Sequence, residues 1–322
     1  MKIIRTLIFI VHIVVVLILV ATALNAYIPP SFTSLLSLLA LGFPVLLIIH
    51  VLLTLFWIIS WKKRAFLFLL ASILMYPMAN RWLTWNKQAE GNLKLITFNV
   101  KAGDYGIENI NRYLKSQNAD VIFLQETGDN NFLADDYHVK KTSIVTILSK
   151  NPIESSGTID IPGIGQSLYA DIKIDGKTIR FINGYLEPFQ IDKSMVRPTG
   201  DTEANQEKAK YLIRYMIPTF KKHENQVDIL KNYVEASPHP VIVGGDFNSV
   251  PNSWEYYHVS KGLNDPFTIA GKGLGTSFHS FKFPIRIDYV FSSKDLKPTS
   301  YQVDRKVMLS DHFPVVTEFK IP

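Results

Sequence analysis

The chain has 322 residues, with 34 Lys and Arg, 28 Asp and Glu, and no cysteine. The first 85 residues carry six of the cations and none of the acids, which leaves 28 cations against 28 acids in residues 86–322. The net charge of +6 therefore belongs to the hydrophobic N-terminal part and indicates a membrane segment rather than a nucleic-acid surface. The lack of cysteine excludes disulfides, thiolate metal sites and cysteine nucleophiles.

Three apolar runs occupy residues 1–85. We expect transmembrane helices at 3–25, 35–61 and 65–85, because about 20 apolar residues in a helix cross a hydrocarbon core of roughly 30 Å. A turn at 27–30 and the second apolar run that follows it disfavour a cleaved signal peptide. The sequence therefore predicts an all-helical membrane region before the rest of the chain.

The cations of this region predict its orientation. Lys2, Arg5 and residues 62–64 lie at the ends of the runs that the positive-inside rule places in the cytoplasm. Three crossings then predict an integral protein of the cell or inner membrane whose remaining chain is extracytoplasmic. In the competing interpretation the third run, which contains Pro77, lies in the membrane interface and the remaining chain stays cytoplasmic.

A short polar linker at 86–92 precedes one α+β domain at 93–322, in which short β-branched runs alternate with turns and a few amphipathic segments. This pattern predicts strands at 93–100, 121–124, 143–148, 168–174, 178–185, 241–244, 287–291 and 315–320. It predicts helices at 107–117, 203–220 and 225–236.

Polar side chains interrupt this pattern at the ends of strands, where a scaffold can present them to a cleft. The residues concerned are Asn99, Glu126, Asn183, Tyr185, Asp246, Asn248, Asp288, Asp311 and His312. Taken singly, each has an ordinary structural explanation as a turn residue, a helix cap, a core residue or a solvated charge. The order of the set is what points to a function.

In this order the motifs resemble those of the endonuclease/exonuclease/phosphatase superfamily, the metal-dependent phosphoesterases that include DNase I, exonuclease III, sphingomyelinases and inositol polyphosphate 5-phosphatases. The most specific matches are the Gly-Asp-Phe-Asn motif at 245–248 and the Ser-Asp-His motif at 310–312, supported by residues 125–126 and 287–289. The resemblance covers 93–322. It implies a DNase I-like, four-layer α/β-β/α sandwich with a Mg²⁺ cleft at one edge of the sheets.

The resemblance also implies a ligand set, in which Glu126 is the principal metal ligand, assisted by Asn99 and Asp311. Carboxylate and amide oxygens suit a hard cation, so Mg²⁺ is the expected cofactor and Mn²⁺ the alternative.

The same resemblance implies catalytic roles for the other residues. Asp246 orients or deprotonates the attacking water, and Asn248 fixes both Asp246 and a phosphate oxygen. Asp288 holds His312 in one tautomer so that the imidazolium contacts the phosphate. Whether Asp246 or His312 is the base stays open at this point.

One motif departs from many relatives. Where these have Asn-x-His-Leu, residues 183–186 read Asn-Gly-Tyr-Leu, as in the exonuclease III branch. Tyr185 is expected to donate a hydrogen bond to phosphate or a proton to the leaving group, since a phenol with a reference pKa near 10 is no base at neutral pH. Asn183 is expected to help shape the substrate site.

The sequence thus predicts a membrane-anchored, Mg²⁺-dependent phosphoesterase whose substrate is a lipid head group, a nucleotide or a nucleic acid. Two alternatives remain, a surface nuclease acting on DNA or RNA and a non-catalytic membrane binding module on the same fold. The balanced charge of residues 86–322 disfavours the nuclease. The lipid bilayer is the expected partner, and no obligate protein partner is evident.

Overall fold

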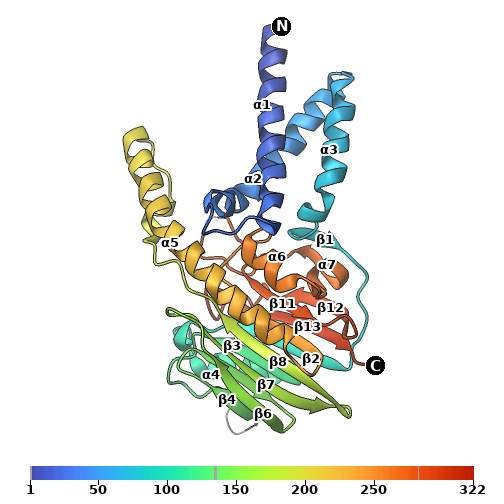
Figure 1. Ribbon diagram of the computed structural model, residues 1–322, viewed down its shortest axis with the longest axis vertical. Coiled ribbons are helices and arrows are strands. Elements are labelled where there is room, and N and C mark those ends of the chain that lie inside the picture. Colours follow the sequence, from blue (N-terminus) through green and yellow to red (C-terminus); the bar gives the residue numbers. More distant parts are fainter. Residues whose placement is uncertain (1, 134–135, 282) are drawn as a thin grey trace.

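The computed structural model describes residues 2–133, 136–281 and 283–322. Three helices stand together at one end of the molecule, and a layered α/β body forms the other end (Figure 1). The helices are α1 (Lys2–Ala21), which continues into the 3₁₀ helix η1 (Thr22–Ala26), α2 (Leu35–Ile59) and α3 (Arg64–Ala79). The segments Lys2–Ala26 and Leu35–Ile59 are long and apolar enough to cross a membrane by length and composition, whereas α3 has 16 residues.

The third apolar run is not helical along its whole predicted length of 65–85. Helix α3 ends at Ala79, soon after Pro77, and strand β1 (Leu83–Trp85) follows. Strand β1 pairs antiparallel with β10 (Lys272–Leu274) of the body. The end of this run is therefore the junction between the helices and the α/β body.

Two sheets form the centre of the body. The order of the five-stranded sheet is β11-β9-β8-β7-β6, and that of the six-stranded sheet is β12-β13-β2-β3-β5-β4. Strands of the first are β6 (Ile153–Ile159), β7 (Gln166–Ile174), β8 (Lys177–Tyr185), β9 (Val241–Asp246) and β11 (Asp288–Ser292). Strands of the second are β2 (Leu93–Asn99), β3 (Val121–Gln125), β4 (His138–Lys141), β5 (Val145–Ser149), β12 (Lys297–Val303) and β13 (Val315–Lys320).

Successive side chains of a strand point to opposite faces of its sheet, so each sheet contributes to two separate layers of the core. Leu95 and Phe123 belong to the core between the sheets, whereas Ile96 and Ile122 belong to the core under helix α4 (Ile107–Gln117). The outer face of the five-stranded sheet packs against α5 (Thr202–Glu235) and α6 (Trp254–Ser260). The remaining short helices are η2 (Lys101–Gly103), η3 (Lys193–Val196) and α7 (Pro266–Ala270). The structure thereby confirms the predicted four-layer sandwich.

Helix α5 corrects one prediction, because the two helices expected at 203–220 and 225–236 are a single helix. Pro218 lies inside it, and the expected break at 221–224 does not occur. His223 in this stretch is fully buried, and its ring nitrogens contact the Glu255 carboxylate at 2.7 Å and the backbone oxygen of Glu187 at 2.6 Å. These tertiary contacts hold the helix continuous.

Strands β1, β4, β6, β10 and β12 were not predicted. They are short, lie at sheet edges, or carry many polar residues, so they lack a clear apolar alternation. Each depends on its neighbour for its structure rather than on its own pattern.

Candidate active site

The predicted site residues gather where five strands of the two sheets end. Asn99 on β2 is the register partner of Gln125 on β3 in the six-stranded sheet. In the five-stranded sheet, Asp246 on β9 is the register partner of both Tyr185 on β8 and Asp288 on β11. Strand pairing thus brings residues that are far apart in the sequence to one edge of the sandwich.

Two glycines allow β9 to fit between its neighbours. A Cβ atom on Gly245, which has a φ of 132°, would collide with the backbone oxygen of Gly184. A Cβ atom on Gly244 would lie 2.6 Å from the backbone oxygen of Tyr289. The Gly-Gly pair before Asp246 is therefore required by close backbone approach on both sides.

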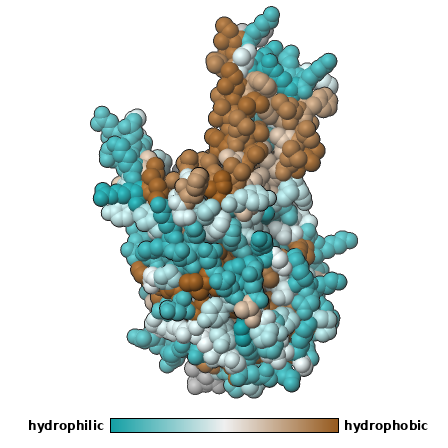
Figure 2. Space-filling model, viewed as in Figure 1, coloured by the Kyte–Doolittle hydropathy of each residue, from teal (hydrophilic) through white to brown (hydrophobic). Residues whose placement is uncertain are grey.

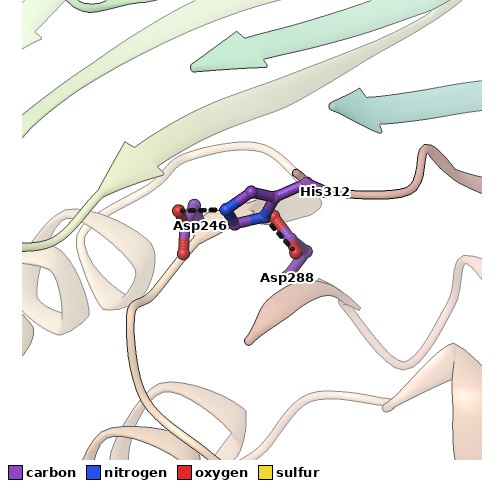
Figure 3. Close-up of side chains that lie close together, drawn as sticks. All are labelled: Asp246, Asp288 and His312. Atoms are coloured by element: carbon purple, nitrogen blue, oxygen red, sulfur yellow. Dashed lines mark hydrogen bonds and ion pairs between the residues drawn. The ribbon is translucent and has the colours of Figure 1, made fainter. Parts of the chain in front are cut away.

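The imidazole of His312 lies between two carboxylates (Figure 3). Its Nδ1 is 2.9 Å from Asp288 Oδ2, and its Nε2 is 3.8 Å from Asp246 Oδ2. All three side chains are buried, and Asp288 Oδ1 has no hydrogen-bond partner among the described residues. The predicted pairing of Asp288 with His312 is thus present in the structure.

Burial and charge shift the pKa values of this group. For His312, burial disfavours the imidazolium, but the carboxylates of Asp288 and Asp246 outweigh burial and raise the pKa to about 9. For Asp246, burial and the neighbouring Asp288 raise the pKa to about 7 against the opposing effect of His312. The pKa values of Asp246 and His312 therefore depend on each other as well as on burial.

Glu126 follows β3 and belongs to a second cluster of hydrogen bonds. Its Oε1 accepts from Asn99 Nδ2 at 2.8 Å and from the Tyr185 hydroxyl at 3.0 Å. The same Asn99 amide donates to Asp246 Oδ2 at 3.0 Å, and its Oδ1 accepts from the Lys101 backbone N–H. Asn99 therefore connects the Glu126 carboxylate of one sheet to the Asp246 carboxylate of the other.

Tyr185 and Asn183 lie behind this cluster. Burial, followed by the charge of Glu126, raises the pKa of Tyr185 well above its usual value, so that the phenol is a donor throughout the ordinary pH range. Asn183 is fully buried, and its amide donates to the backbone oxygens of Leu124 and Thr146. Asn183 thus joins the two sheets beneath the site instead of lining the cavity.

A cavity of about 240 Å³ opens beside these residues. Its polar end is lined by Lys101, Glu126, Asn248, Asp311 and His312. The Asn248 backbone N–H donates to Asp246 Oδ1 at 2.9 Å, which couples the cavity to the buried carboxylate behind it. Of the nine predicted site residues, four line the cavity and the others support them.

Lys101 is a cavity residue that the sequence did not single out. Its Nζ lies 3.7 Å from Asp311 Oδ2 and 5.5 Å from the centre of the Tyr105 ring. The sequence feature that could have identified Lys101 is its position two residues after Asn99, directly after β2.

The residues at this edge fit a divalent cation. Among the described residues, Asp246, Asp288 and His312 each offer a ligand atom within 4.8 Å of the other two, and Asp288 Oδ1 is a buried oxygen without a partner. Glu126 and Asp311 add carboxylates that line the cavity. Oxygen-rich groups of this kind suit Mg²⁺ or Mn²⁺.

Comparison with known families agrees with this geometry. Residues 96–312 match the model of the Endonuclease/Exonuclease/phosphatase family, so the chain belongs to that family, whose members are phosphoesterase hydrolases. Residues 5–82 match the model of a domain of unknown function. No curated protein matches the chain.

Solved structures share the fold. A zebrafish TDP2 humanized by 14 mutations is 18% identical, with a TM-score of 0.53 over 70% of this chain and 98% of that one. An endonuclease/exonuclease/phosphatase family protein from Leptotrichia buccalis is 19% identical, with a TM-score of 0.52 over 70% and 99% of the two chains. The 3′ phosphatase NExo from Neisseria is 16% identical, with a TM-score of 0.52 over 70% and 99%. At these identities the likeness shows the DNase I-like fold alone.

Proposed function

We propose that this chain is a membrane-anchored phosphoesterase that hydrolyses phosphodiester or phosphomonoester bonds with Mg²⁺ or Mn²⁺ as cofactor. The observation that carries the proposal is an imbalance of charge among the described residues, because three carboxylates converge where the cationic side chains are Lys101 and His312. The carboxylates are those of Glu126, Asp246 and Asp288. An anionic phosphate approaches such a site only if a further cation accompanies it.

Glu126 is the principal ligand in this proposal, assisted by Asn99 and Asp311. Glu126 and Asp311 both line the cavity, and the Asn99 amide contacts Glu126. A divalent cation bound here would neutralise charge on the phosphate and so favour attack at phosphorus.

Hydrolysis forms a bond between the water oxygen and phosphorus and breaks the ester P–O bond. The water gives up one proton, and the leaving oxygen takes one. We assign Asp246 as the base, because Nδ1 of His312 already faces Asp288 and its Nε2 points to Asp246. His312 then stabilises the phosphate as a cation between two carboxylates.

The remaining side chains complete the site. Asn248 lines the cavity and holds a phosphate oxygen, while its backbone N–H fixes the Asp246 carboxylate. Tyr185 supplies the proton that the leaving oxygen takes, and Asn183 shapes the substrate site from beneath.

A nuclease is the second candidate. The Neisseria NExo structure holds a product DNA hairpin, and another zebrafish TDP2 structure holds a single-strand DNA product. The equal numbers of cations and acids in residues 86–322 give less support to a DNA or RNA substrate than a basic groove would.

The proposed orientation places the α/β body outside the cytoplasm. Lys2, Arg5 and residues 62–64 lie together at the end of the helices far from the body. The positive-inside rule assigns that end to the cytoplasm. A protease added to intact cells should therefore cut the body, and full protection in intact cells with cleavage after lysis would contradict the orientation.

The cofactor is tested on full-length protein purified in detergent, with bis(4-nitrophenyl) phosphate as substrate and Mn²⁺ binding followed by electron paramagnetic resonance. A chelator should abolish hydrolysis and Mg²⁺ should restore it. Glu126→Gln should weaken Mn²⁺ binding at least tenfold, because replacing even a residue that only hydrogen-bonds to a metal ligand typically weakens binding by roughly 10- to 100-fold. Glu154→Gln removes a carboxylate on β6 outside the cavity and serves as the control.

Results other than those expected would change the proposal in different ways. Turnover that resists the chelator would contradict metal dependence. Unchanged Mn²⁺ affinity in Glu126→Gln, together with its loss in Asp288→Asn, would move the cation to the Asp246, Asp288 and His312 group. Mn²⁺ binding without turnover of any phosphate ester would favour the binding-module alternative.

A further inference from the structure

The cavity that begins at the catalytic residues is apolar over most of its wall. Beyond the polar end, it is lined by Phe189 and Ile191 after β8, by Met216 of α5 and by Phe278 and Phe281. Pro188, Val250, Ile285 and Ile287 complete that side of the wall. The site therefore offers a phosphate group polar partners at one end and a hydrophobic surface at the other.

The apolar wall begins directly at the catalytic histidine. The Phe278 ring lies edge-on to the His312 imidazole, with 4.9 Å between the ring centres. Phe281 packs against Phe278 at 5.0 Å, and Phe283 on the same segment is 69% exposed. A group attached to a phosphate at His312 would thus lie next to an apolar surface.

This wall is continuous with the helices at the N-terminus. Phe278 and Ile287 share one packed cluster with Phe43 of α2 and Met75 of α3, and Leu41 of α2 itself lines the cavity. On the face drawn in Figure 2, the apolar surface of the helices extends down to the body, which is mostly hydrophilic on that face. The cavity therefore lies where the two surfaces meet.

The length of α2 sets the level of the cavity relative to a bilayer. Its 25 residues measure about 37 Å, longer than a hydrocarbon core of roughly 30 Å. The excess of about 7 Å covers roughly the first five residues of α2, so Leu41, the seventh residue, lies near the boundary between the hydrocarbon core and the head groups on the side of the body. Tyr27 and Phe32, in the turn before α2, are 81% and 80% exposed, as expected of aromatic residues at a membrane interface.

We propose that the substrate is an amphiphilic lipid phosphate ester, bound with its phosphate at Asn248 and His312 and its hydrocarbon chain along Leu41, Phe189, Met216 and Phe281. This inference rests on the proposed phosphoesterase activity and names its substrate class. The lipid enters sideways from the head-group region, so that the ester bond reaches the site without the chain leaving an apolar environment.

A nucleic acid fits the same cavity less well. Its backbone needs several cations along its path, and the cavity offers Lys101 and His312 among its described lining residues. The wall where the next nucleotides would lie is made of apolar side chains, which leave charged phosphates without partners.

The test is a series of 4-nitrophenyl alkyl phosphodiesters with chains of two to twelve carbons, hydrolysed with Mg²⁺ by full-length protein in detergent. For the natural sequence kcat/KM should rise with chain length, by up to about fourfold for each methylene group that becomes buried. We expect at least a tenfold rise between the two-carbon and eight-carbon esters.

A pair of variants separates binding of the chain from partition into detergent. Ile191→Gln places an amide in the cavity wall and should reduce the ratio of kcat/KM for the long and short esters at least fivefold. Val139→Gln changes a partly exposed apolar residue on β4, outside the cavity, and should leave the ratio unchanged.

The outcomes distinguish this inference from the proposed function. Turnover that depends on Asp246 but is equal for all chain lengths would overturn the lipid assignment and leave the phosphoesterase standing. Equal ratios in Ile191→Gln and Val139→Gln would likewise overturn it. Lack of turnover of every ester would overturn the proposed function and, with it, the substrate class. Faster cutting of oligonucleotides than of every ester would assign a nuclease instead.

Discussion

Buried acidic side chains occur in two regions of this molecule with opposite surroundings. The first region is the packed part of the body that does not line the cavity, called the frame here, and its buried acids include Asp265 and Glu187. Asp265 accepts from Arg286 Nη2 at 2.8 Å, from Arg286 Nη1 at 3.0 Å and from the Tyr256 hydroxyl at 2.7 Å. Glu187 accepts from Lys222 at 2.6 Å and from two backbone N–H groups. Burial alone would raise the pKa of Glu187, but these donors outweigh it and lower the pKa.

At the active site the pKa of a buried acid shifts in the opposite direction. Asp246 and Asp288 share the single imidazole of His312, and the pKa of Asp246 is raised to about 7 by burial and by Asp288. Among the described residues, cations neutralise Asp265 and Glu187 in the frame, whereas Asp246 and Asp288 outnumber the imidazole that they share. Under the proposed function, the difference marks where an added cation and an anionic substrate are stabilised together, and it predicts which acids matter for stability and which for catalysis.

The largest expected effect is the loss of activity in Asp246→Asn. The amide keeps the shape of the side chain but cannot accept a proton, so kcat should fall by roughly 10²- to 10⁴-fold. Hydrolysis of bis(4-nitrophenyl) phosphate by full-length protein measures this loss.

The same variant should change its melting temperature little, because it removes a buried charge beside Asp288 but also replaces one of two hydrogen-bond accepting oxygens with a donor. A rate near that of the natural sequence would refute the role of Asp246 as base. A large fall in melting temperature would instead place Asp246 among the acids of the frame.

Asp265→Asn is the matched substitution in the frame, and we expect it to affect mainly stability. It leaves the fully buried Arg286 without its counter-charge, a change that typically destabilises by about 3–5 kcal/mol. For a domain of this size that lowers the melting temperature by roughly 6–20 °C. Circular dichroism of the protein in detergent measures the shift, and a melting temperature within 2 °C of the natural sequence, as a rough limit, would contradict it.

The sequence singled out more of the residues that gather at one edge of the sandwich than of the residues that form the frame. Asn99, Glu126, Asp246, Asp288 and His312 were found because each interrupts a strand pattern at its end, and strand pairing then brings them together. Their order along the chain was sufficient to indicate the family. The hydrogen bonds among them, such as the contact of Asn99 with both Glu126 and Asp246, depend on two sheets meeting and could not be predicted.

The residues that the sequence missed are those whose partners lie far away in the chain. Arg286 and Asp265 form a buried pair, and although Arg286 directly precedes the motif at 287–289, nothing in the sequence connects it with Asp265. The apolar wall of the cavity combines Leu41, Met216 and Phe278, which look like ordinary apolar residues in their own segments. Only the tertiary structure shows that they surround one space.

Glu187→Gln gives a smaller effect that depends on pH. The folded state lowers the pKa of Glu187, so its carboxylate stabilises the fold above its unfolded pKa of about 4.3, and this contribution is lost as pH falls through the lower folded pKa. We expect the variant to lose about 1.5 kcal/mol at neutral pH, the value of one hydrogen bond to a charged group. The gap in melting temperature from the natural sequence should close below pH 4.3 or so. A gap of constant size down to about pH 3 would show that the loss is not one of charge.

The smallest expected effect concerns the helical region, where polar groups are paired without any net charge. Trp57 Nε1 donates to His12 Nδ1 at 3.1 Å, His12 Nε2 contacts His50 Nδ1 at 2.9 Å, and His50 Nε2 contacts Ser72 Oγ at 2.9 Å. Because His12 accepts from Trp57, its other nitrogen donates to His50, which in turn donates to Ser72. This chain of hydrogen bonds joins all three helices.

Ser72→Ala removes the last acceptor of that chain and should destabilise the protein by about 0.6 kcal/mol, the average for hydrogen bonds between membrane helices. Ser37→Ala is the control, because the buried Ser37 hydroxyl of α2 has no hydrogen-bond partner among the described residues. Melting temperatures of both variants in the same detergent should differ by about 1–2 °C, with Ser72→Ala the lower. Equal melting temperatures would show that this chain of hydrogen bonds adds nothing to helix packing, while a fall in kcat/KM of Ser72→Ala alone would show that the helices also act on the site.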